Sequence, residues 1–153
     1  FLRDGFPRLR RAVPETRLIV GGAGAPTALA SVAASTPGVE LVGEVHDDEP
    51  LYSRARAFVD VGLGGAGTRV KLLNAFARGL PAAGTPDAVE GLDAVPGEHV
   101  AVLDPAGSLE PLVEVLTDDG TWRRLSERSR ELVRTRSRPE VAFAALDEAL
   151  GDR

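Results

Sequence analysis

The sequence predicts an α/β fold with three layers, in which a parallel β-sheet lies between two layers of helices. Two observations carry this prediction. Short apolar runs rich in Val, Ile and Leu alternate along the chain with segments of helical spacing, and strands separated by helices pair in parallel through right-handed crossovers. With 153 residues, of which 43% are hydrophobic and 27% charged, the chain also has the size and composition of one globular domain.

The composition excludes several classes of protein. The formal net charge is −5, from 18 basic and 23 acidic residues, whereas a protein that binds nucleic acid or an anionic membrane needs clustered positive charge. The absence of cysteine excludes disulfides and thiolate metal sites. No apolar run approaches the roughly 20 residues of a membrane span. We therefore expect no nucleic-acid partner and a cytoplasmic protein, attached at most peripherally to the inner face of the membrane.

The first half of the chain contains three predicted strands and three predicted helices. The strands are short runs of β-favouring apolar residues at 17–20, 39–42 and 57–61. The helices predicted around them are residues 1–13, which Pro14 ends, residues 26–34, which begin with Pro26, and a short helix at residues 51–52, for which Asp47 and Asp48 are the candidate N-caps.

The second half begins with the most regular predicted helix, at residues 68–78. An apolar stripe on this helix is expected to face the core, and Gly79 is its predicted C-cap. The stripe consists of Val70, Leu73, Phe76 and Ala77; the later elements are strands at 81–83 and 99–103, an irregular loop at 85–98, and helices at 108–116, 122–135 and 139–150, with Asp118, Asp119 and Ser137 as candidate caps.

Open parallel sheets bind ligands at the carboxyl ends of their strands, so the loops after the strands are the candidate sites. The first such loop is VGGAGAP, residues 20–26. A dinucleotide-binding pattern would need a further glycine where Thr27 stands and an acidic residue at the proper distance after a strand. The loop therefore favours a tight turn between strand and helix.

The richest loop is GLGGAGTRVK, residues 62–71. Its glycines allow close approach of a ligand, and the helix that follows presents free N–H groups and partial positive charge. Arg69 and Lys71, the latter the single lysine of the chain, oppose the helix dipole there, so a phosphate or diphosphate explains them better than folding does. Thr68 stands where a P-loop has its lysine, which argues against nucleotide hydrolysis. A surface helix with solvated charges remains the alternative.

The third loop is VGEVHDDE, residues 42–49, in which His46 precedes three acidic residues. Consecutive positions on one loop rarely converge on one metal ion, so we interpret the acidic residues as helix caps and expect no metal site. His99 lies in or beside a strand and is expected to be structural. The chain has no G-x-S-x-G nucleophile elbow.

A set of ordered fragments resembles a known family. The fragments are LIVGGAG at 18–24, VELVGEVHD at 39–47, FVDVGLGGAGTRVKLLNAFARGLP at 58–81, EGL at 90–92 and PGEHVAVLDP at 96–105. Together they resemble the C-terminal half of a retaining GT-B glycosyltransferase of the group 1 type, and G-T-R-x-K marks a subgroup. The resemblance implies a Rossmann-like domain that binds a nucleoside diphosphate sugar, and a separate N-terminal domain that holds the acceptor. Such enzymes are usually metal-independent, so no cofactor is implied.

The resemblance also implies roles for individual residues. Arg69 and Lys71 match the basic catalytic residues that face the donor diphosphate. Two glutamates eight positions apart are common in the family where this chain has Ala66 and Asn74. Asn74 therefore replaces the residue that grips the ribose, and an amide lacks the charge assistance of a carboxylate. The other nucleotide-binding positions that the resemblance implies are Gly22, Gly24, Gly43, Glu44, Val45, Gly65, Gly67 and Thr68.

We therefore expect residues 1–153 to be one donor-binding domain of a longer, two-domain bacterial glycosyltransferase that transfers a hexose-type sugar. The chain does not begin with Met, and the resemblance places a strand and a loop with a basic residue before Phe1. The isolated domain is expected to be inactive, because an interdomain cleft contributes contacts and excludes water. The alternative is a non-catalytic scaffold or binding domain whose donor site has decayed at Asn74.

Overall fold

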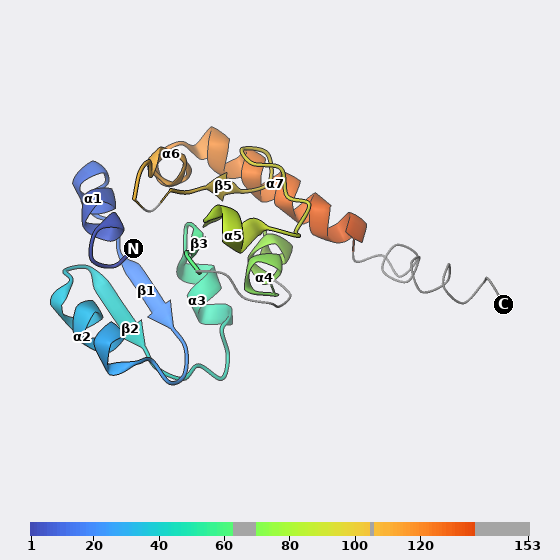
Figure 1. The fold of residues 1–153 in the computed structure, drawn as a ribbon. Coiled ribbons are helices and arrows are strands. Elements are labelled where there is room, and N and C mark those ends of the chain that lie inside the picture. Colours follow the sequence, from blue (N-terminus) through green and yellow to red (C-terminus); the bar gives the residue numbers. More distant parts are fainter. Residues whose placement is uncertain (63–69, 105, 137–153) are drawn as a thin grey trace.

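Figure 1 shows the fold in the computed structural model, which describes residues 1–62, 70–104 and 106–136. Helices and strands alternate through most of these ranges, and the strand pairs are parallel, as predicted. The predicted helix at residues 139–150 and the predicted cap Ser137 lie outside them. The elements in chain order are α1 (Gly5–Ala12), β1 (Leu18–Gly21), α2 (Thr27–Ser35), β2 (Val39–Val42), α3 (Glu49–Arg54), β3 (Phe58–Asp60), α4 (Val70–Arg78), β4 (Ala82–Gly84), α5 (Pro86–Val89), β5 (Ala101–Val102), α6 (Glu110–Thr117) and α7 (Asp119–Arg136).

The strands form two sheets, and not the single sheet that the sequence predicts. Strand β1 pairs with β2, with Leu18 opposite Val39, and β3, β4 and β5 form the second sheet, with Phe58 opposite Ala82. Among the described residues no strand joins β1 to β3, so each of these strands has one open edge. The predicted α/β class with parallel strands is confirmed, and only the grouping differs, because alternating strands and helices indicate parallel pairing but do not fix which strands are neighbours.

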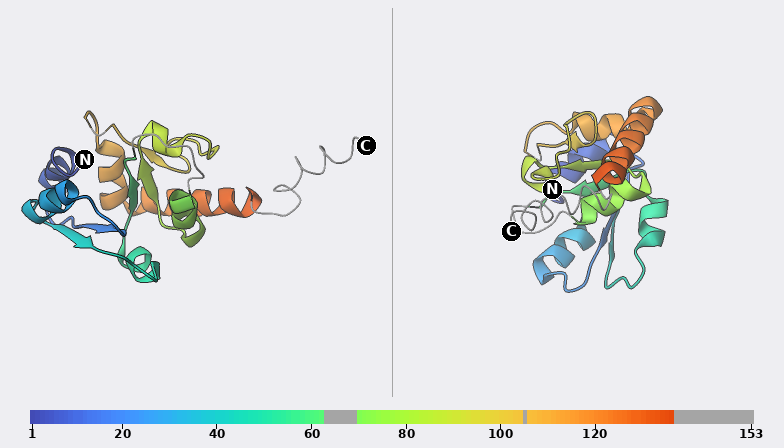
Figure 2. Two further views of the ribbon diagram at one scale, coloured as in Figure 1. Left: turned by 60° about the horizontal axis from the view of Figure 1, so that its bottom comes forward. Right: turned by 90° about the vertical axis from the view of Figure 1, so that its right-hand side faces the viewer.

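The sheet formed by β3, β4 and β5 has helices on both faces, which confirms the predicted layers in this part of the chain. Successive residues of a strand point to opposite faces. Ala83 of β4 belongs to a buried cluster with α1 and α6, whereas Ala82 belongs to one with α4. Figure 2 shows α6 and α4 on opposite sides of this sheet. Leu18 and Val39 pack against the first cluster, so the core around α1 and α6 also holds the smaller sheet.

Helix α4 buries a face that is rotated slightly from the predicted stripe and shares Phe76 with it. Its buried residues are Leu72, Ala75 and Phe76. Val70 and Ala77 of the predicted stripe are exposed, Val70 by 53%. The predicted residues and the buried residues both have helical spacing. The buried face includes Gly79 at the end of the helix, and α7 packs against α4 there. Gly79 has a φ of 69°, and an added Cβ there would collide with Arg130, which confirms glycine as the C-cap.

The predicted helix caps are confirmed in part. Asp118 caps α7, because its Oδ2 accepts a hydrogen bond from the N–H of Thr121 at 2.5 Å, and this bond lowers the pKa of Asp118. Asp48 precedes α3 without a side-chain capping bond. Asp47, the other predicted cap, makes the bond instead, because its Oδ1 accepts from the N–H of Glu49 at 3.0 Å.

Two further boundaries differ from the prediction. Pro26 is the N-cap of α2 and not its first residue, because its ψ of 145° is extended. The segment 85–98, predicted to be irregular, contains α5, a short helix that Thr85 caps by accepting from the N–H of Ala88 at 3.3 Å. Of the helices within the described ranges, none has the length and apolar character needed to cross a membrane.

Candidate functional site

The glycine loops that follow β1 and β2 meet at the carboxyl ends of these strands. The N–H of Gly22 donates to the carbonyls of Val42 at 3.3 Å and Gly43 at 3.2 Å. The structure therefore brings together Gly22 and Gly43, two of the predicted nucleotide-binding positions. Gly24 lies on the first of these loops, two positions after Gly22.

The first loop is the tight glycine turn that the sequence predicts. Gly22 and Gly24 have φ angles of 152° and 67°, which favour glycine. Gly43 is different, because it is not among the residues with positive φ, and an added Cβ would meet no described atom within 4 Å. Neither the backbone conformation nor the described packing therefore requires glycine at position 43.

Glu44 and Val45, which follow on the second loop, have different surroundings. Glu44 is exposed, whereas Val45 is half-buried. A Cβ added to Gly21 would lie 3.7 Å from Cγ2 of Val45 and 3.0 Å from Cδ1 of Leu51. Val45 and α3 therefore lie close to the end of β1, and this packing positions the loop after β2 beside the loop after β1.

The loop after β3 carries four of the predicted site residues. Asp60 Oδ1 accepts from the N–H of Gly62 at 2.9 Å, and the hydroxyl of Thr85 donates to the carbonyl of Gly62 at 3.3 Å. These bonds tie the start of the loop to the end of β4. The predicted site residues that follow lie outside the described residues, and these are Gly65, Gly67, Thr68 and Arg69.

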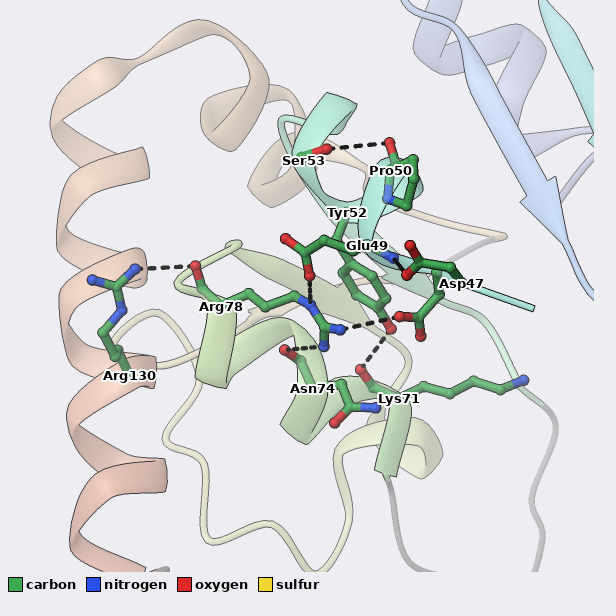
Figure 3. A network of polar contacts seen from close by, with 10 residues as sticks. Asp47, Glu49, Pro50, Tyr52, Ser53, Lys71, Asn74, Arg78 and Arg130 are labelled. Carbon is green, nitrogen blue, oxygen red and sulfur yellow. Dashed lines mark hydrogen bonds and ion pairs between the residues drawn. The ribbon is translucent and has the colours of Figure 1, made fainter. Parts of the chain in front are cut away.

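Helix α4 carries the remaining predicted site residues, Lys71 and Asn74. Lys71 is exposed, and its side chain extends away from the neighbouring polar contacts (Figure 3). Asn74 is half-buried and follows three residues later, so the two side chains are neighbours on the helix surface. Within the ranges that the structure describes, neither the Lys71 ammonium nor the Asn74 side-chain amide has a hydrogen-bond or ion-pair partner.

Sequence reasoning missed a polar cluster beside these two residues. At the end of α4, Arg78 donates from Nε to Glu49 Oε2 at 2.8 Å and from Nη2 to Asp48 Oδ1 at 3.0 Å. Its guanidinium carbon lies 4.4 Å from the centre of the Tyr52 ring (Figure 3). We call Arg78, Asp48, Glu49 and Tyr52 the Arg78 cluster. The acidic run at 47–49 was its one sequence signal, and we interpreted that run as helix caps alone.

Tyr52 connects the Arg78 cluster both to the predicted site and to the core. Its hydroxyl donates to the carbonyl of Lys71 at 3.4 Å. Its ring stacks on Phe58 of β3, with centroids 5.8 Å apart. Burial raises the pKa of Tyr52, the charge of Asp48 raises it further, and the charge of Arg78 partly opposes these effects.

The pKa of Arg78 is also raised, chiefly by its hydrogen bond to Glu49. The guanidinium therefore remains charged while it bridges α4 and α3.

The histidines do not form a metal site with the acidic residues in the described part of the chain. No group of three or more His, Cys, Asp or Glu side chains there is arranged to hold an ion. His46 is exposed. His99 is structural, as predicted, because its Nδ1 accepts from the N–H of Val95 at 3.0 Å and fixes the turn before β5.

Comparison with known proteins agrees with the resemblance that the fragments indicated. The model of the family described as "Glycosyl transferases group 1" matches residues 1–118, which include the elements from α1 to α6. A search of curated proteins gives no match. Because the family match spans most of the 153 residues, the chain belongs to the group 1 glycosyltransferases.

Proposed function

We propose that this chain is the donor-binding half of a retaining GT-B glycosyltransferase and that it binds a nucleoside diphosphate sugar. The observation that carries the proposal is the Lys71 ammonium, which is exposed in the first turn of α4 and has no partner among the described residues. A cation at a helix N-terminus opposes the helix dipole. A bound diphosphate would reverse that disadvantage, because it satisfies both the cation and the free N–H groups of the helix.

In the proposed reaction a hexose-type sugar leaves the nucleoside diphosphate for an acceptor, and negative charge develops on the departing diphosphate. Arg69 and Lys71 would stabilise that charge in the role that a metal ion plays in other transferases. The backbone of Gly65, Gly67 and Thr68 would lie beneath the phosphates, with its N–H groups as donors. This arrangement needs no cofactor besides the donor substrate.

The loops after β1 and β2 would form the other walls of the proposed site. Gly22 and Gly24 would border the cleft, and Gly43, Glu44 and Val45 would run along the nucleotide base. Two observations support this assignment. Gly22 and Gly43 are hydrogen-bonded neighbours, and no described contact requires glycine at position 43. A glycine at that position leaves room for a flat ring to approach the backbone.

We propose further that the chain belongs to a longer two-domain protein in which one more parallel strand lies between β1 and β3. In a doubly wound sheet the first strand lies in the middle, between two wings. The pair β1–β2 and the sheet β3–β4–β5 have the order of such wings. Successive backbone N–H groups of a strand point to opposite edges. Leu18 and Gly22 donate toward β2, so the N–H of Ile19 points to the other edge of β1. Phe58 donates toward β4, so the N–H of Val59 points to the open edge of β3. One inserted strand would pair both edges.

Asn74 favours a second candidate function, a scaffold or binding domain of the same family whose donor site has decayed. A ribose hydroxyl can bond to an amide, but the bond lacks the charge assistance that a carboxylate supplies. If Asn74 marks a decayed site, the chain has the family's fold and binds no nucleoside diphosphate. The two candidates therefore differ in a property that a titration measures.

The test replaces Asn74 with Glu in the protein at its full natural length. For a functional donor site, Asn74→Glu should tighten nucleoside diphosphate binding by roughly 1 kcal/mol, the difference between a neutral and a charge-assisted hydrogen bond. Asn74→Gln is the matched control, because it lengthens the side chain without adding charge. The measurement is calorimetric titration with UDP and with GDP. Absence of binding by all three proteins, with the fold intact, would reject the donor site and favour the scaffold.

A further inference from the structure

The Arg78 cluster joins the two elements that would flank the proposed donor site. Three N–H groups of one guanidinium bond to Glu49 and Asp48 at the start of α3 and, at 3.5 Å, to the carbonyl of Asn74 in α4. Arginine suits this task because its donors form a rigid planar fork. The link therefore sets how the segment that follows β2 lies relative to α4.

The same cluster holds the backbone of both described site residues on α4. Arg78 donates to the Asn74 carbonyl, and Tyr52, stacked beneath the guanidinium, donates to the Lys71 carbonyl at 3.4 Å. Tyr52 is itself stacked on Phe58 of β3. The arrangement in Figure 3 therefore connects the start of α4 to the central part of the fold through side chains of α3 and β3.

The other end of α4 is anchored independently. Arg130 of α7 donates to the carbonyl of Arg78 at 3.0 Å, and the hydroxyl of Ser126 donates to the carbonyl of Gly79 at 2.6 Å. The backbone of Arg78 is thus held by α7, and its side chain reaches from this fixed point to α3. This gives the side chain a stable base from which to position α3.

Arg78 itself does not lie where the diphosphate would bind. It follows Lys71 by seven residues, which corresponds to about 10 Å along the helix axis. Its charge is also already matched by Asp48 and Glu49. Exposed ion pairs contribute little to stability, and the carboxylates of this cluster are 48% and 61% exposed. Stability alone therefore gives little reason for the cluster.

We infer that Arg78 is a positioning residue for the donor site, which holds α3 and the segment after β2 against α4 without touching the ligand. The inference rests on the proposed function. Arg78→Ala should raise the Kd for a nucleoside diphosphate about tenfold, because small displacements of binding groups have large effects on a preorganised site. Arg78→Lys keeps the charge but not the fork, and should give an intermediate Kd.

Arg56 provides a matched control. Its Nη2 pairs with Asp119 at 2.6 Å and its Nε donates to the carbonyl of Val115 at 3.3 Å, so it too links separate elements. It precedes β3 and therefore lies at the amino end of that strand, away from the loops of the proposed site. Arg56→Ala should change the melting temperature about as much as Arg78→Ala does, and should leave the Kd unchanged.

The experiment measures the Kd for UDP and GDP and the melting temperature of the unaltered protein and of the three variants, all at full natural length. A higher Kd for Arg78→Ala, partly restored in Arg78→Lys and absent in Arg56→Ala, supports the inference. Binding by the unaltered protein together with an equal Kd for Arg78→Ala overturns the inference alone. No binding by the unaltered protein overturns the proposed function and, with it, the role of Arg78.

Discussion

Strand β1 of the smaller sheet and strand β4, the middle strand of the larger sheet, are both apolar but differ strongly in burial. Leu18, Ile19 and Val20 of β1 are only half-buried, whereas Ala82 and Ala83 of β4 are fully buried. Strand β4 has β3 and β5 on its two edges and helices on both faces. Strand β1 has a neighbour on one edge only among the described strands. The burial of a strand in this molecule therefore depends more on the strands and helices beside it than on how apolar its own side chains are.

The difference also divides the proposed site. The loops of Gly22 and Gly43 belong to the less buried sheet, whereas Lys71 and Asn74 stand on α4, which packs against the more buried one. The Arg78 cluster connects the two regions beside these residues. Predictions that compare the two regions therefore test both the fold and the site.

The largest expected effect compares one leucine from each region. Leu112 of α6 is 1% exposed, and Leu112→Ala should lower the free energy of unfolding by about 3–5 kcal/mol, the cost of a cavity in a closed core. Leu41 of β2 is half-buried, and Leu41→Ala should cost about 1 kcal/mol. Urea unfolding of the 153-residue chain measures both. Equal losses would contradict the proposed difference in packing.

The second prediction concerns the open edges of β1 and β3. If a further strand lies between them in the natural protein, the amides of Ile19 and Val59 should exchange with solvent slowly at full length and quickly in the 153-residue chain. The amide of Phe58, which donates to Pro81 at 2.9 Å, is the internal control and should be protected in both. Hydrogen exchange followed by NMR measures all three. Equal rates for Ile19 and Val59 in the two proteins would argue against the inserted strand.

The smallest expected effect is a pH dependence where the two regions meet. Tyr52 is the single tyrosine of the chain, and burial together with the charge of Asp48 raises its pKa although the charge of Arg78 opposes them. A raised pKa in the folded state means that the associated stability is present below the ordinary value of about 10 and is lost as pH rises through the folded value. Tyr52→Phe should therefore flatten the alkaline loss of stability. Tyrosinate absorbance of the unaltered chain gives the pKa directly, and an unshifted value would show that the cluster is not formed.

Most elements could be predicted from the sequence because their signals are local. Strand β1 is an apolar run that ends at a glycine, Gly21. Helix α1 ends shortly before Pro14, and α4 ends before Gly79, so each of these boundaries is marked by a residue close to it in the sequence. The division into two sheets could not be predicted, because strand pairing joins residues that are distant along the chain. The predicted buried face of α4 differs from the observed one by a small rotation. Two sets of apolar residues on this helix have helical spacing, and the packing of α7 against α4 determines which set is buried.

In the candidate site, too, the features with local sequence signals could be predicted, and those that join distant residues could not. The glycine turn at Gly22 and Gly24 depends on local φ angles, so sequence pattern was enough to predict it. The Arg78 cluster was missed because the partners of Arg78 lie 29 and 30 positions earlier in the sequence. An arginine at a helix C-terminus is also expected on grounds of the helix dipole alone, which hides any further role.

The central claim is that the start of α4 binds a diphosphate, and Lys71 tests it most directly. In the protein at full natural length, Lys71→Ala should weaken the binding of UDP or GDP by about 1.5–3 kcal/mol, the usual contribution of a charged hydrogen bond. Its thermal stability should change little, because Lys71 is exposed. Arg123→Ala, which removes an exposed cation from α7, is the control and should bind as the unaltered protein does. Calorimetric titration that finds the same affinity for Lys71→Ala as for the unaltered protein would contradict the claim.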